Sequence, residues 1–153
     1  MKNSNKDSIL KWATVIASGV LFCLSLTQNA YCIQSNLTTR CVDSASALLL
    51  GWFGVLLGGA AVTWLANPFL VVSWVIIFTA PGKFALGTSL FTSLIMLSFL
   101  TFDKVLINEA GHYSAIIDYS SGYWLWLSSS VILVLGNLLV MVSAKNRTEP
   151  YSA

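Results

Sequence analysis

Charge is what this sequence lacks most. Only 14 of its 153 residues are charged, or 9%, whereas soluble domains carry roughly 25%. A soluble protein of this size would need a charged exterior, and here there are too few charges to make one. Hydrophobic residues make up 56% of the chain, and the mean hydropathy is +0.77. This composition excludes a disordered chain, a nucleic-acid-binding domain and an ordinary soluble enzyme, and it predicts a small integral membrane protein.

The sequence also lacks the motifs that mark common active sites. It contains no zinc signature, no nucleophile elbow, no phosphate-binding loop and no paired carboxylates on an expected scaffold. No ionisable side chain falls at the centre of an expected membrane span, where such a group would by itself indicate a function. We therefore expect a protein that is not an enzyme, with no catalytic or metal-binding residues, no cofactor and no nucleic-acid partner.

The uncharged stretches predict where the chain crosses a membrane. A helix needs about 20 apolar residues to cross a hydrocarbon core ~30 Å thick. The 39 uncharged residues from 44 to 82 are too many for one crossing, and Asn67-Pro68 interrupts them. We expect an all-α integral membrane protein, a single polytopic domain over residues 1–153 that folds as a four-helix transmembrane bundle. The spans are expected at about 9–26, 44–66, 84–102 and 122–142, with a short re-entrant or interfacial segment at 69–80 between the second and third spans.

The positive charges favour four spans over five. Lys and Arg concentrate on the cytoplasmic side of membrane proteins. Four spans place six of the eight positive charges on the side of the termini, whereas five spans divide them four and four. We therefore expect cytoplasmic termini, outer loops at 27–43 and 103–121, and a plasma or bacterial inner membrane as the location. The exit of the first span, Thr27-Gln28-Asn29-Ala30, lacks the small residue at the −3 position that signal-peptide cleavage needs, so we expect a retained anchor.

Small residues recur along one face of the expected second span. They follow one another at steps of four, three, four and three residues, which places them on one side of a helix. They are Ala47, Gly51, Gly54, Gly58 and Ala61. Small residues let membrane helices approach one another closely. The stripe therefore predicts helix packing, either inside the bundle or between copies of the chain, and the pattern alone does not separate the two.

Asn137 is the one strongly polar side chain well inside an expected span. Amide and hydroxyl side chains commonly join membrane helices by hydrogen bonds. We therefore favour an interhelical hydrogen bond for Asn137. A contact with a substrate or an ion in a transport pathway is the alternative.

The three cysteines have different expected roles. Cys32 and Cys41 lie in the first outer loop, where an oxidising compartment would favour a disulfide between them. Cys23 lies in the first span and is expected to fill apolar space. Thiol–disulfide exchange is a less favoured function for the loop pair because it usually relies on a Cys-x-x-Cys spacing.

The second outer loop contains residues that could serve a metal or a proton. Glu109 and His112 are three residues apart, so they would share a face if the loop were helical. A lone histidine beside acidic residues is usually solvated surface, and we expect no metal site there. The first outer loop contains the glycosylation sequon Asn36-Leu37-Thr38, which matters only in a secretory-pathway host.

In outline, four spans with a cysteine-bearing first outer loop resemble tight-junction and related tetraspan proteins. The tryptophan–glycine–leucine–tryptophan signature of the junction proteins is absent from residues 27–43, and we assign the chain to no family. We expect a small non-enzymatic multi-pass protein of the lipid bilayer that acts through helix packing with itself or with partner membrane proteins. Its role would be in accessory, assembly, immunity or exclusion functions. The alternative is a small oligomeric transporter or channel, with Asn137 and segment 69–80 near its pathway.

Overall fold

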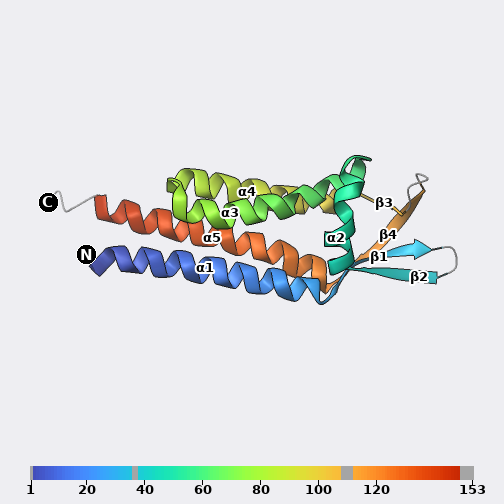
Figure 1. The fold of residues 1–153 in the computed structure, drawn as a ribbon, viewed down its shortest axis with the longest axis horizontal. Coiled ribbons are helices and arrows are strands. Elements are labelled where there is room, and N and C mark those ends of the chain that lie inside the picture. Colours follow the sequence, from blue (N-terminus) through green and yellow to red (C-terminus); the bar gives the residue numbers. More distant parts are fainter. Residues whose placement is uncertain (1, 36–37, 108–111, 149–153) are drawn as a thin grey trace.

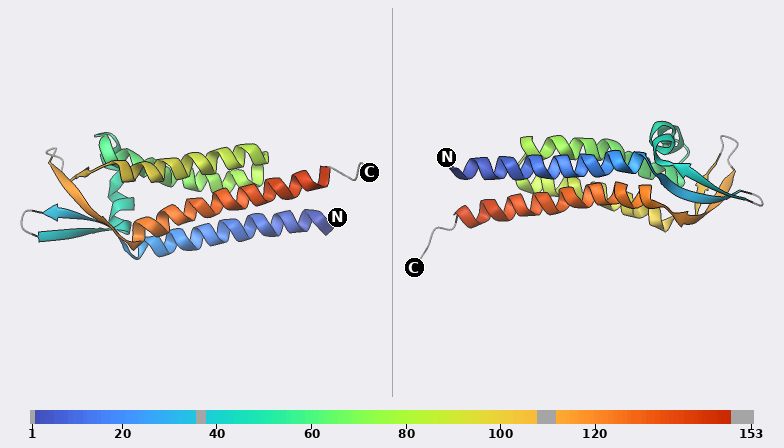
Figure 2. Two further views of the ribbon diagram at one scale, coloured as in Figure 1. Left: turned by 180° about the vertical axis from the view of Figure 1, so that it is seen from behind. Right: turned by 90° about the horizontal axis from the view of Figure 1, so that it is seen from below.

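Four long helices form a bundle that carries a small β-sheet at one end (Figure 1). The computed structural model describes residues 2–35, 38–107 and 112–148. The long helices are α1 (Lys2–Leu26), α3 (Ala66–Thr79), α4 (Gly82–Ser98) and α5 (Ser121–Thr148). The start of α1 and the end of α5 lie away from the sheet (Figure 2). We call the two ends of the bundle the terminal end and the sheet end.

The expected number of apolar helices is confirmed. Within the described residues, four helical stretches are long and apolar enough to cross a membrane, with 20 to 25 residues each. At ~1.5 Å per residue, each one reaches about 30 Å or more. They are Lys6–Leu26, Gly59–Thr79, Gly82–Thr101 and Ser121–Lys145. The third includes the short 3-10 helix η2 (Phe99–Thr101) that continues α4.

The expected second span at 44–66 is wrong. The helix that begins at Ser44 ends at Val55, and a 3-10 helix, η1 (Gly59–Leu65), then continues directly into α3. The break falls at Gly58 and Gly59, whose φ angles are +79° and +63°. Glycine adopts this left-handed conformation without a steric penalty, and it commonly ends a helix. Pro68 does not interrupt the span, because it lies in the first turn of α3, where proline is tolerated.

The short apolar helix is therefore in a different place from the one expected. Residues 69–80 do not form a separate re-entrant or interfacial segment, since α3 runs through them to Thr79. The short helix is α2 (Ser44–Val55), which lies between the first and second spans. It runs across the sheet end of the bundle, between the long helices and the strands (Figure 1).

The expectation of an all-α protein is also wrong, because both expected outer loops form strands. The strands are β1 (Asn29–Ser35), β2 (Thr38–Asp43), β3 (Lys104–Leu106) and β4 (Tyr113–Tyr119). They make one sheet in the order β2-β1-β4-β3, and every neighbouring pair is antiparallel. The strands are rich in the β-branched and aromatic residues that suit a pleated surface.

The central pairing of the sheet joins segments that are far apart in the chain. β1 follows the first span and β4 precedes the last one, and Tyr31 of β1 lies opposite Tyr119 of β4. The phenol rings of Tyr31 and Tyr119 both lie against Phe99 of η2, with ring centroids 5.3 Å and 5.8 Å apart. An aromatic cluster therefore fixes the sheet on the bundle.

Small and polar side chains fill much of the bundle interior, whereas large apolar ones point outward. Ser18, Ser73 and Ser129 have no exposed surface, while Leu94 and Leu139 are 63% and 58% exposed. In water this arrangement would be unfavourable, but lipid tails solvate apolar side chains and small residues allow close helix contacts. The packing therefore agrees with the membrane class expected from the composition.

Candidate functional site

Asn137 joins α5 to α4. Its side chain is only 2% exposed. The amide nitrogen donates to the backbone oxygen of Ala85 at 3.1 Å and to the hydroxyl of Ser89 at 3.2 Å. Both acceptors belong to α4, so one side chain bridges two helices. An amide used in this way holds the bundle together, because few other partners exist in a hydrocarbon environment.

Similar polar contacts connect the other long helices. Each involves a serine, threonine or asparagine side chain, and two of them use an indole N–H as the donor. They are Ser93 to Ser130 at 3.0 Å, Ser73 with Thr92 at 3.3 Å, Trp74 to Ser18 at 2.9 Å and Trp126 to Asn67 at 2.9 Å. Together they link α4 to α5, α3 to α4, α3 to α1 and α5 to α3. These hydrogen bonds thus connect all four long helices through their buried polar side chains.

Three of the five residues of the small-residue stripe lie at the contact between α2 and η1, inside one molecule. A Cβ on Gly51 would come within 2.5 Å of the Trp64 ring, and a Cβ on Gly54 would lie 2.8 Å from the Cβ of Ala61. Both distances are too short for real side chains, so the two glycines permit the close approach. The Trp64 indole N–H also donates to the backbone oxygen of Leu48 at 2.7 Å. Gly51, Gly54 and Ala61 therefore pack α2 against the start of the second span.

The two remaining residues of the stripe have other positions. A Cβ on Gly58 would have no neighbouring atom within 4 Å, and the left-handed conformation of this residue forms the turn after α2. Ala47 faces a cavity under α2. The five residues of the stripe thus have three different roles: three pack α2 against η1, one forms a turn and one lines a cavity. They do not share one face, because the helix that would have aligned them ends at Val55.

A cavity of about 710 Å³ lies under α2, between that helix, the sheet and the ends of the long helices. Its walls are mostly apolar and include aromatic rings from six elements. These are Phe22 of α1, Tyr31 of β1, Phe53 of α2, Trp64 of η1, Phe99 of η2, and Tyr123 and Trp126 of α5. A cavity of this size falls in the range of ligand-binding pockets, roughly 300–1,000 Å³.

Asp43 fixes the beginning of α2. Its carboxylate accepts a hydrogen bond from the backbone N–H of Ser46 at 2.8 Å, which is the usual geometry of a helix N-cap. The hydrogen bond from the Ser46 backbone is the main cause that lowers the pKa of Asp43, and the Ser46 side chain adds to it. The charged cap therefore holds α2 in place at the point where β2 ends.

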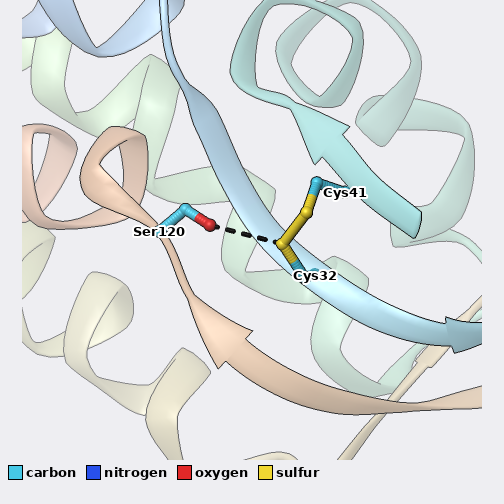
Figure 3. The surroundings of a disulfide bond; sticks show 3 residues. All are labelled: Cys32, Cys41 and Ser120. Atoms are coloured by element: carbon cyan, nitrogen blue, oxygen red, sulfur yellow. Dashed lines mark hydrogen bonds between the residues drawn. A yellow bond between two sulfur atoms is a disulfide. The ribbon is translucent and has the colours of Figure 1, made fainter. Parts of the chain in front are cut away.

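Cys32 and Cys41 form a disulfide between β1 and β2, as expected from the sequence (Figure 3). The two residues lie directly opposite each other in the antiparallel register. The sulfur of Cys32 also lies 3.5 Å from the hydroxyl of Ser120, which precedes α5. The bridge therefore connects the first hairpin covalently, close to the start of the last span. Cys23 is a free cysteine on the exposed surface of α1.

The second expected outer loop gives no metal site among the described residues. No group of three or more His, Cys, Asp or Glu side chains in that part of the chain is arranged to hold a metal ion. His112 is exposed, and its backbone oxygen accepts a hydrogen bond from Ile107. Glu109 lies outside the described residues, as does part of the sequon Asn36-Leu37-Thr38.

Two close contacts were not predicted from the sequence. Trp64 covers Gly51, and Thr14 of α1 lies against Gly136 of α5. The second pair is separated by more than a hundred residues, and no local pattern indicates it. The helix break was indicated by the Gly58-Gly59 pair, since two adjacent glycines are a turn signal.

Comparison of the chain with protein-family models, with curated proteins and with solved structures gave no match.

Proposed function

We propose that this chain is a non-enzymatic multi-pass membrane protein that acts through contacts with itself or with partner membrane proteins. Its role would be an accessory, assembly, immunity or exclusion role. The observation that supports this proposal is that the buried polar side chains of the bundle are used in hydrogen bonds within the molecule. Among the described residues, Asn137 and the buried serine and threonine side chains other than Ser44 bond to neighbouring elements or to their own backbone. The interior groups thus hold the fold, and interactions with other molecules are left to the surface.

We propose that the surface of α1 makes the contact with a second copy or a partner membrane protein. Gly51, Gly54 and Gly136 are covered by side chains of the same molecule, whereas Gly19 has nothing within 4 Å of its Cβ position. An uncovered glycine lets a second helix approach closely. Cys23, one turn further along α1, is exposed on the same face. It is therefore a natural reporter of any contact at Gly19.

Oxidative crosslinking in native membranes would test the proposal. We expect mild oxidation to join Cys23 to a second copy or to a partner thiol, because Cys32 and Cys41 are already bonded to each other. Gly19→Leu should abolish the adduct, while Gly87→Leu on α4, which also has open space above it, should leave it intact. Cys23→Ser is the negative control. A chain that stays monomeric by mass in mild detergent and gives no Cys23 adduct in its native membrane would contradict the proposal.

We also propose that the terminal end faces the cytoplasm of a plasma or bacterial inner membrane. The positive charges support this orientation, because Lys and Arg concentrate on the cytoplasmic side. Six of the eight lie in the parts of α1, α4 and α5 that are nearest the terminal end. We do not propose a transporter or channel. That alternative depended on a re-entrant segment at 69–80, and α3 occupies those residues. It also depended on Asn137 facing a pathway, whereas its amide bonds to α4.

A further inference from the structure

The cavity under α2 is bordered by exposed apolar residues and by two exposed charged residues. Leu50, Phe53 and Leu57 line the cavity and are also 64%, 57% and 56% exposed, so they stand at its opening. No charged residue occurs between Asp43 and Lys83. This opening therefore continues the uncharged surface of the second span. Arg40 and Asp43 of β2 also line the cavity, and both are exposed.

The cavity wall presents more apolar than polar surface, and several of its polar side chains donate hydrogen bonds to protein atoms. The bonds are Thr63 to Ala60, Trp64 to Leu48, Ser25 to Phe22, Tyr123 to Met96 and Trp126 to Asn67. An apolar occupant therefore suits this space.

We propose that the cavity binds one acyl chain of a phospholipid from the leaflet at the sheet end. The acyl chain lies among the aromatic side chains under α2, and the phosphate pairs with Arg40. The charge of Arg40 complements a phosphate, and the apolar mouth formed by Leu50, Phe53 and Leu57 gives access from the bilayer. This inference goes beyond the proposed function and does not depend on it, because lipid retention is measured on the isolated chain.

A photoactivatable phospholipid would test the site without any substitution. The wild-type chain is placed in a bilayer disc with a phosphatidylcholine that carries a diazirine near the end of one acyl chain. We expect adducts on Phe99 and Tyr123, which line the cavity but are only 7% and 2% exposed. Bulk lipid does not reach such side chains. Adducts confined to outward-facing residues such as Leu56 and Leu94 would overturn the proposal.

A matched pair of variants in α2 tests whether the cavity itself holds the chain. Ala47 lines the cavity, whereas Ala45 does not. Ala47→Leu should lower the amount of phospholipid retained through purification, measured by native mass spectrometry. A displacement of roughly two methylenes corresponds to about tenfold weaker binding. Ala45→Leu should retain lipid like the wild type. Equal retention by both variants, with unchanged thermal unfolding, would overturn the proposal.

A second pair of variants tests the headgroup. Arg40→Gln should remove the preference for phosphatidylcholine over a diacylglycerol with the same acyl chains. Lys104→Gln, at another exposed cation on the sheet, should keep that preference. Equal binding of the two lipids by the wild type would overturn the phosphate contact. Free inorganic phosphate that binds at Arg40 without any lipid retention would overturn the whole assignment.

Discussion

Gly136 of α5 lies directly against the side chain of Thr14 of α1. A Cβ placed on Gly136 would overlap both the methyl and the hydroxyl group of Thr14. Thr14 is itself fixed, because its hydroxyl donates to the backbone oxygen of Leu10 at 2.8 Å. The first and last spans therefore meet at a position that admits no side chain.

We expect Gly136→Ala to destabilise the bundle by about 1–3 kcal/mol, the usual cost of overpacking. Equilibrium unfolding in mixed micelles would measure the loss. Gly19→Ala is the matched control, because nothing lies within 4 Å of that position. It should stabilise the helix slightly, by up to ~1 kcal/mol, through helix propensity. Equal effects of the two substitutions would show that α1 and α5 do not meet at this point.

The contact between α2 and η1 predicts a compensating pair of substitutions. Gly54→Ala should loosen α2, because the added Cβ would lie 2.8 Å from the Cβ of Ala61. Adding Ala61→Gly should restore the packing. Protease cleavage within α2 would report the loosening and its reversal. If the double variant is cleaved as fast as Gly54→Ala alone, the two residues are not in contact.

The effect of substitutions at Gly58 on stability should depend on the backbone conformation that the new residue accepts rather than on the size of its side chain. Its φ of +79° is poorly tolerated by branched residues but is accepted by asparagine. Gly58→Val should therefore cost about 1–2 kcal/mol of stability, and Gly58→Asn should cost less. Thermal unfolding would compare the two. A larger loss for asparagine than for valine would argue against the left-handed turn.

The disulfide predicts a difference between the cysteines. Replacing Cys32 and Cys41 together by serine should lower stability by about 2–4 kcal/mol, the typical contribution of such a bridge. Cys23→Ser should change it little, because Cys23 is free and exposed. Unfolding curves with and without reductant provide the measurement. Wild-type protein that unfolds identically in both conditions would contradict the bridge.

The N-cap of α2 predicts a dependence on acid pH. The hydrogen bonds from Ser46 lower the pKa of Asp43 below its ordinary value of 3.8. The folded state therefore binds the proton less readily than the unfolded state, and the cap contributes its stability above the ordinary pKa. That contribution is lost as the pH falls through the lowered pKa. Asp43→Asn keeps an acceptor for the Ser46 N–H but does not titrate.

Unfolding midpoints between about pH 2 and pH 6 would compare the two proteins. Other carboxyl groups titrate in both, so their effects cancel in the difference. We expect wild type to lose stability relative to Asp43→Asn as the pH falls. A constant difference across this range would show that the charge of Asp43 does not support α2.

Hydropathy and charge predicted the membrane class and the number of apolar helices, because both depend on local composition. The position of the second span was not predictable in the same way. The chain offers two candidate breaks, at Gly58-Gly59 and at Asn67-Pro68, and both are turn signals. The first one ends a helix here, and the close contacts of Gly51 and Gly54 with residues 61–64 hold the folded-back segment.

The sheet was missed for a different reason. Its central pair joins β1 to β4, which are separated by about half of the chain, and the edge strand β3 is only three residues long. Short strands become stable through neighbours that local pattern does not specify. The disulfide was predictable because Cys32 and Cys41 are close in sequence. For Asn137, the sequence indicated an interhelical bond, but its acceptors on α4 required the structure.

The order of the strands also determines when the protein can be completed during synthesis. The ribosome makes β1 and β2 with the first part of the chain, but β1 receives its second partner only when β4 emerges, just ahead of the last span. Until then the nascent hairpin has an open edge, which can pair with other extended chains. A chain that terminates before residue 113 would keep that edge permanently. The sheet is therefore completed by a segment that is made immediately before the final span.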